Sequence, residues 1–174
     1  MGLGKTRQAI VAMEAGCPEG TVLVVCPASL KLNWRREILM VDSKASIEVL
    51  GVDKDQTDAP RWIIINYDIL SKYAERLHAI DWAGIILDEA HFIKNASKRT
   101  THCLKLLGVQ AEAHAPLIGP DYVFLLTGTP MTNRPKDLFN LFRCVEQVFG
   151  SDLFNLFRCV GHPAARSFLS FAKR

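Results

Sequence analysis

Strand-like apolar runs that alternate with stretches of helical spacing limit most strongly what this chain can fold into. They occupy residues 21–27, 61–67, 83–91 and 122–130, and a shorter run lies at 46–50. Apolar runs without polar alternation are typical of strands that are covered on both faces of a parallel sheet. Because helical stretches separate them, the sequence predicts an α/β fold with a mostly parallel sheet flanked by helices.

The segments between the apolar runs supply the helices and loops. We expect helices over 6–15, 28–39 and 68–80, and Asp68 has the type of side chain that caps a helix N-terminus. The stretch 53–60 is polar and ends in proline, which predicts a surface loop. In open α/β sheets ligands bind beyond the carboxyl ends of the strands, so we expect the functional site there.

The chain divides into two parts of different character. Residues 1–134 carry the alternating pattern, whereas 135–174 are predicted to form a mainly helical tail. This tail contains the sequence DLFNLFRCV twice, at 137–145 and at 152–160. A solenoid needs several repeats of about 20–50 residues, so we interpret the two copies as a recent duplication rather than as a repeat architecture.

A glycine-rich turn, MGLGKT, occupies the first residues. Gly4, Lys5 and Thr6 match the last three positions of the phosphate-binding pattern G-x-x-x-x-G-K-[ST], and a predicted helix follows. Backbone N–H groups at such a turn attract phosphate oxygens. The lysine of this pattern neutralises the β- and γ-phosphates, and the threonine hydroxyl binds Mg²⁺. Read alone, the turn also fits a chance Gly-Lys-Thr at a helix cap.

An acid pair follows the apolar run 85–87. Asp88 would hold magnesium, and Glu89 would orient and deprotonate an attacking water. His91 could touch the γ-phosphate or a neighbouring segment. Read alone, the two acids could simply cap the next helix, but together with the Gly-Lys-Thr turn they favour a nucleotide site.

Composition excludes some classes of protein. The net charge of +3 permits contact with nucleic acid without demanding it. The 5 cysteines form no Cys-x-x-Cys pair, so we expect reduced thiols, and His91, His102, Cys103 and His114 match no common zinc spacing. No apolar run reaches the roughly 18 residues of a membrane span, and no secretory signal is visible. We expect a cytoplasmic protein, nucleoid-associated if bacterial or nuclear if eukaryotic, with no membrane contact.

Five motifs occur in a familiar order: MGLGKT, VLVVCPASLKLNWRREI, IINYDIL, IILDEAHFIKNASKRT and LLTGTPMTNRP. Together they resemble the first RecA-like lobe of Swi/Snf-type ATPases, and among these the annealing-helicase-like branch. The resemblance covers essentially residues 1–174. It implies a RecA-like P-loop NTPase lobe with ATP and Mg²⁺ as cofactors, and double-stranded DNA and a second RecA-like lobe as partners.

The resemblance also implies roles for individual positions. Catalytic roles fall to Lys5, Asp88 and Glu89. Nucleotide binding is implied for Gly2, Gly4, Lys5, Thr6, Asp88 and His91, with Thr6 and Asp88 at the metal. DNA backbone contacts are implied for Ser29, Lys31, Asn33, Lys94, Asn95 and Lys98. Coupling of hydrolysis to DNA is implied for Thr127, Gly128 and Thr129. Alternatives stay open for two of these: Ser29 as a helix cap, and the lysines after Ile93 as solvated charges.

Two departures from the family pattern bear on activity. The family's first strand, which is normally central in the sheet, would lie upstream of Met1, and the second lobe with its arginine fingers would lie beyond Arg174. We therefore expect a partial ATP-binding lobe that turns over little or no ATP by itself, a fragment of an ATP-dependent DNA translocase. The alternatives are a non-catalytic remnant that binds DNA through 27–37 and 94–105, or a truncated reading frame without function.

Overall fold

A computed structural model gives the fold of the protein. It describes residues 4–54, 58–93, 103, 106, 120 and 122–127. The predicted tail over 135–174, with both copies of its duplicated segment, lies outside these residues.

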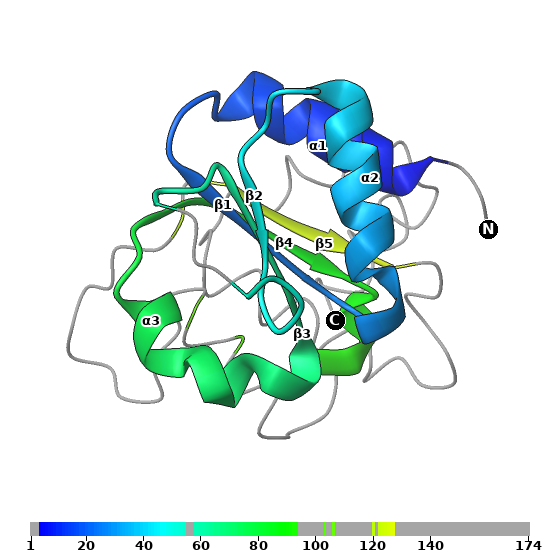
Figure 1. Cartoon of the computed structure of the whole chain (residues 1–174). Helices are drawn as coiled ribbons and strands as arrows, with labels where there is room; N and C mark the ends of the chain where they lie inside the picture. The colour runs from blue at the N-terminus through cyan, green and yellow to red at the C-terminus, as the bar shows by residue number, and fades with distance from the viewer. Residues whose placement is uncertain are drawn as a thin grey trace, which may run out of the picture.

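One parallel sheet forms the centre of the described structure (Figure 1). Its strands are β1 (Thr21–Cys26), β2 (Ile47–Val49), β3 (Trp62–Asn66), β4 (Trp82–Asp88) and β5 (Tyr122–Leu126). They follow the order β2-β3-β1-β4-β5, and each neighbouring pair is parallel. Every predicted apolar run overlaps one of these strands, so the α/β prediction is confirmed.

The described strands pair in an unbroken ladder. β1 lies in the middle, between β3 and β4, while β2 and β5 are the outer strands. The described strands therefore form one continuous ladder, with β2 and β5 at its two edges.

Helices cover both faces of the sheet (Figure 1). The α-helices are α1 (Lys5–Gly16), α2 (Lys31–Val41) and α3 (Ala74–His78), and the 3₁₀ helices are η1 (Ala28–Leu30), η2 (Tyr67–Tyr73) and η3 (Ala90–Ile93). The first two α-helices lie side by side on one face, where Arg7 of α1 donates to Glu37 of α2. η2 and α3 lie on the opposite face. No helix of the described part is long and apolar enough to span a membrane.

Alternate residues of the strands fill two separate cores. Val22 and Val24 of β1 pack with Ile10 of α1 and Trp34 of α2 on one face. Leu23 and Val25 pack on the other face with the side chains of η2 and α3. Because successive side chains of a strand point to opposite faces, a strand that serves two cores must be apolar at every position. This is why the strands of the sequence read as continuous apolar runs.

The third predicted helix differs from its expectation. It begins as η2 and becomes α-helical only in α3. Asp68 lies in the first turn, and Asn66 is the N-cap residue without a side-chain hydrogen bond, so the predicted Asp68 cap is wrong. The buried side chains here are Tyr67 and Leu70. A spacing of three residues places them on the same side of a 3₁₀ helix, which favours the tighter turn.

Candidate functional site

The candidate site lies at the carboxyl end of β4, an inner strand of the sheet. β1 and β5 flank this strand in parallel, and Asp88 is its last residue. The side chain of Asp88 is buried, with 8% of the residue exposed. Parallel strands present their carboxyl ends at the same edge, which is where the fold class led us to expect the site.

The first residue described before α1 is a left-handed glycine. Gly4 is the N-cap residue and adopts a left-handed conformation, with φ 68° and ψ 23°. A Cβ at this position would meet nothing within 4 Å, so the backbone conformation alone is what requires glycine. The first turn holds Lys5 and Thr6, both half-buried, and no acidic residue. The N–H groups of such a turn have no partner within the helix and attract anions.

Two hydrogen bonds orient the Asp88 carboxylate. The indole Nε1–H of Trp34 donates to Oδ2 over 2.9 Å, and the backbone N–H of Glu89 donates to Oδ1 over 2.9 Å. The hydroxyl of Tyr67 donates to the Asp88 carbonyl over 2.7 Å and fixes the backbone as well. A carboxylate has about four lone-pair positions, so two remain for a metal ion or for water.

Burial and neighbouring charges act on Asp88 in opposite directions. Burial raises the pKa of its carboxyl above the usual value, while the bonds from Trp34 and from the Glu89 N–H, and the charge of Lys5, act to lower that pKa. The charge of Glu89 raises it further. The charge of Lys5, at the start of α1, is thus one of the charges that act on Asp88 at the end of β4.

Glu89 adopts a backbone conformation that is unusual for a residue with a side chain. Its φ is 51°, in the left-handed region. Its carbonyl accepts a hydrogen bond from the Phe92 N–H over 3.0 Å as the chain turns into η3. His91 lies within this 3₁₀ helix by its backbone. Left-handed residues other than glycine cost about 1–3 kcal/mol and concentrate at functional sites, so Glu89 is strained where catalysis is expected.

The oxygen donors at this edge fit magnesium. Mg²⁺ prefers oxygen ligands and is usually held by one or two carboxylates together with phosphates and water. Asp88 offers the remaining acceptor positions of its carboxylate, and Thr6 offers a hydroxyl in the first turn of α1. These residues could therefore hold a magnesium ion that is also bound to a nucleotide.

The described residues contain no group of three His, Cys, Asp or Glu side chains placed to hold a metal ion. His102 and His114 lie outside them. Among the described cysteines, Cys17, Cys26 and Cys103 are free and buried. Burial raises the pKa of Cys26, at the end of β1, to about 12, so this thiol is uncharged near Asp88.

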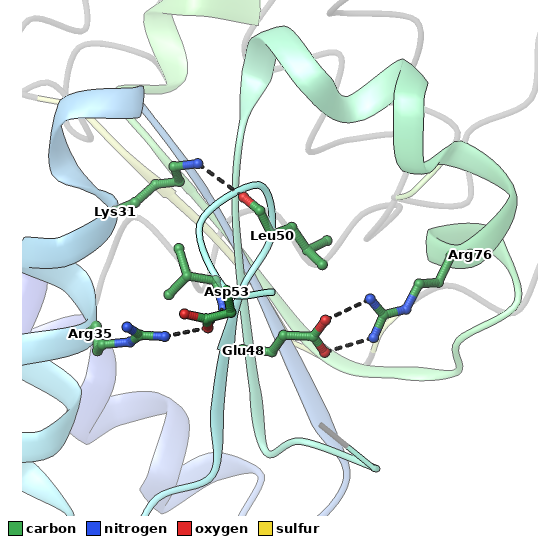
Figure 2. Close-up of polar contacts among 7 residues, drawn as sticks. Lys31, Arg35, Glu48, Leu50, Asp53 and Arg76 are labelled. Carbon is green, nitrogen blue, oxygen red and sulfur yellow. Dashed lines mark hydrogen bonds and ion pairs between the residues drawn. The ribbon is translucent and has the colours of Figure 1, made fainter. Parts of the chain in front are cut away.

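The residues expected to contact DNA fall into different environments. Ser29 is exposed in η1, and Asn33 is half-buried with its Oδ1 accepting from Arg36 over 3.0 Å. The N-cap positions of η1 and α2 are Pro27 and Leu30, so Ser29 does not cap either helix. Lys31 is only 7% exposed, and its amine donates to the Leu50 carbonyl over 3.0 Å (Figure 2). Its charge is held inside the lobe.

Of the three residues expected to couple hydrolysis to DNA, Thr127 is described. It directly follows β5, at the same sheet edge as Asp88. The expected site residues that lie outside the described part are Gly2, Lys94, Asn95, Lys98, Gly128 and Thr129.

Sequence reasoning missed two residues that hold Asp88, namely Trp34 and Tyr67. Trp34 shares the buried side of α2 with Ile38, and in the sequence it was only one of several apolar residues at helical spacing. Tyr67 directly follows the apolar strand β3, and nothing in the sequence gave its hydroxyl a partner. Both polar groups are found only when the fold brings their elements to the end of β4.

Comparisons with known proteins agree with this arrangement. Residues 1–164 match the model of the SNF2-related domain family. The chain is 33% identical over 153 residues to the SWI/SNF-related matrix-associated actin-dependent regulator of chromatin subfamily A-like protein 1 of Xenopus laevis, covering 86% of this chain and 15% of the relative. It is 33% identical over 161 residues to the DNA annealing helicase and endonuclease ZRANB3 of Bos taurus, covering 87% and 14%.

Solved structures show the same likeness. The SWI2/SNF2 ATPase core of Sulfolobus solfataricus in complex with dsDNA superimposes with a TM-score of 0.69 at 27% identity, covering 88% of this chain and 31% of that one. The core domain described without DNA gives a TM-score of 0.66 at 27% identity, covering 97% and 35%. The predicted RecA-like fold is confirmed, and the chain spans a small part of the length of these relatives. The chain belongs to the SNF2-related domain family.

Proposed function

We propose that this chain is the nucleotide-binding part of an ATP-dependent DNA translocase. In this proposal ATP and Mg²⁺ bind between the N-terminus of α1 and the carboxyl end of β4. The observation that carries it is the pairing of a left-handed Gly4 with Lys5 at the start of α1 and a buried carboxylate, Asp88, at the carboxyl end of β4. A metal-bound triphosphate needs a group of each kind. Membership of the family supports the same assignment.

Each side chain at the site then has a distinct task. The Lys5 ammonium and the N–H groups of the first turn bind the phosphates, with Gly4 giving the turn its shape. Thr6 and Asp88 would hold the magnesium ion, which neutralises charge on the β- and γ-phosphates when it is bound. Glu89 would take the proton from the attacking water. His91 follows Glu89 in η3 and is proposed as a contact of the γ-phosphate or of a neighbouring segment.

The proposed DNA surface begins at the start of α2. Ser29 and Asn33 would meet the phosphate backbone of duplex DNA, together with Lys94, Asn95 and Lys98. Lys31 is left out of this set because its amine is bound to Leu50. Phosphate contacts give affinity without reading bases, which suits a motor that moves over any sequence. The segment 127–129 would couple hydrolysis to these contacts.

Full activity is proposed only for a longer protein. In phosphoryl transfer an arginine finger accelerates hydrolysis by about 10³–10⁵, and family members carry it on a second RecA-like lobe. This chain covers 31% of the DNA-bound core of Sulfolobus solfataricus. A second lobe is therefore the protein partner that we propose, and we expect slow turnover or none from the 174 residues alone.

Binding of a fluorescent ATP analogue in the presence of Mg²⁺ tests this function. We expect K5A and D88N to weaken binding at least tenfold, since each removes a charge that faces the phosphates or their metal. K44A is the matched control, because Lys44 is an exposed lysine that follows α2 at a distance from the site. Equal binding by all four proteins would refute the proposed site. Salt-sensitive DNA binding without nucleotide binding would instead favour a non-catalytic remnant.

A further inference from the structure

Three side chains on the inner side of α2 hold three different parts of the lobe. Lys31 donates to the carbonyl of Leu50, and Arg35 donates to the carboxylate of Asp53 (Figure 2). Trp34 lies between them in sequence and donates to Asp88. Positions i, i+3 and i+4 share one side of a helix, so these bonds act on a single face of α2.

The opposite side of the same two helical turns faces solvent. Leu32 and Arg36 are exposed, and Ser29 is exposed just before the helix begins. Asn33, which belongs to the proposed DNA surface, lies between them and is half-buried. The first part of α2 thus has the proposed DNA surface on one side and a bond to the proposed magnesium ligand on the other.

The bond between Trp34 and Asp88 is well suited to transmit a displacement. Trp34 has none of its surface exposed and packs in the core between α1, α2 and the sheet. A closely packed indole cannot change its orientation without moving its neighbours. A movement of α2 relative to β4 would therefore stretch this bond, and a change at the Asp88 carboxylate would be felt by α2.

We propose that Trp34 is a positioning residue that links occupancy of the nucleotide site at Asp88 to the DNA-facing side of α2. This inference rests on the proposed function, because it needs both ligands to bind. Coupling of this kind is reciprocal: if nucleotide changes the affinity for DNA by some factor, DNA changes the affinity for nucleotide by the same factor. Typical factors lie at about 5–150.

The chain contains a matched control for this bond. The indole Nε1–H of Trp62 donates to the Glu14 carboxylate over 3.0 Å, and Trp62 is as deeply buried as Trp34. This second indole–carboxylate bond joins β3 to α1 and does not touch Asp88. W34F and W62F thus remove the same chemical group from the same core, but only W34F removes it from the proposed site.

Affinity for a fluorescent DNA duplex is measured by anisotropy for the full chain, with and without a non-hydrolysable ATP analogue and Mg²⁺. We expect nucleotide to change this affinity at least fivefold in the wild type and in W62F, and less than twofold in W34F. Undiminished coupling in W34F, or no coupling in a wild type that binds both ligands, would overturn the inference while leaving the proposed function intact. A wild type that binds neither ligand would overturn both.

A spectroscopic measurement on the unaltered chain covers the case in which W34F does not fold. The sequence has 3 tryptophans, so the indole region of a ¹H–¹⁵N spectrum should contain three signals, which W62F and W82F assign. We expect the Trp34 signal to move most when the nucleotide analogue binds, and to move again when duplex DNA is added. A Trp34 signal that stays in place while both ligands saturate the protein would contradict the inference.

Discussion

Arg76 of α3 forms a bidentate ion pair with Glu48 of the outer strand β2. Its two terminal nitrogens lie 2.7 Å from the two carboxylate oxygens, and the Glu48 side chain is only 3% exposed (Figure 2). The hydrogen bond to Glu48 raises the pKa of the Arg76 guanidinium above its usual value. The pair fastens an outer strand to the helix that covers it.

Removing the Arg76 side chain should therefore destabilise the fold. R76A leaves a buried carboxylate without its partner, and we expect the free energy of unfolding to fall by about 3–5 kcal/mol. Urea denaturation followed by circular dichroism measures this change. The control is R7A, since the pair of Arg7 and Glu37 is exposed and should matter by about 0.5 kcal/mol or less. A similar small effect in both variants would show that Glu48 becomes hydrated when Arg76 is absent.

The left-handed backbone of Glu89 gives a second prediction. Glycine adopts this conformation without strain, whereas alanine does not, so E89G should be more stable than E89A by about 1 kcal/mol. The comparison is repeated at Glu75, an exposed position inside α3, where alanine should be the more stable by about 1 kcal/mol. Thermal unfolding of the four variants measures both differences. The same order at both positions would mean that Glu89 is not held in the left-handed region.

Much of the fold could be predicted because parallel strands that lie between two helical layers appear in the sequence as continuous apolar runs. β1 serves a core on each face, so every position after Thr21 is apolar and the strand is recognisable without its neighbours. The place of the candidate site was also predictable, because parallel strands such as β4 present their carboxyl ends at one edge of the sheet, and Asp88 is the last residue of that strand.

The inner side of α2 could not be predicted in the same way. Lys31 is buried while its neighbour Leu32 is 58% exposed, which reverses the order that hydrophobicity favours. The reversal depends on the Leu50 carbonyl, which lies in a turn 19 residues further along the chain. This carbonyl accepts a hydrogen bond from the Lys31 amine. The partners of Trp34 and Tyr67 are equally distant in sequence. Long-range hydrogen bonds of this kind leave no periodic signal.

Asp53 gives a prediction for the dependence of stability on pH. Burial acts to raise the pKa of its carboxyl. The hydrogen bonds from Arg35 and the Val49 N–H, together with the charges of Arg35 and Lys31, outweigh burial and lower this pKa below its usual value. A lowered pKa in the folded state stabilises the fold above the unfolded pKa, and this stabilisation is lost as pH falls through the folded pKa. We expect D53N to be less stable than the wild type at pH 6, and the difference to shrink below about pH 4.

Urea denaturation between pH 2.5 and pH 6 measures this difference, with D81N as a control that removes an exposed carboxylate. A difference between D53N and the wild type that stays constant over the whole range would show that the Asp53 carboxylate does not titrate there.

The last prediction concerns whether Lys31 stabilises the fold or contacts DNA. K31M keeps most of the side-chain volume but removes the donor to the Leu50 carbonyl, so we expect the free energy of unfolding to fall by about 1–3 kcal/mol. Because the amine faces the interior, the affinity for duplex DNA and its dependence on salt should not change. N33A is the comparison, since loss of a contact at the proposed surface should weaken DNA binding without a similar loss of stability. If K31M instead reduced the slope of log affinity against log salt by about 1, Lys31 would be a phosphate contact after all.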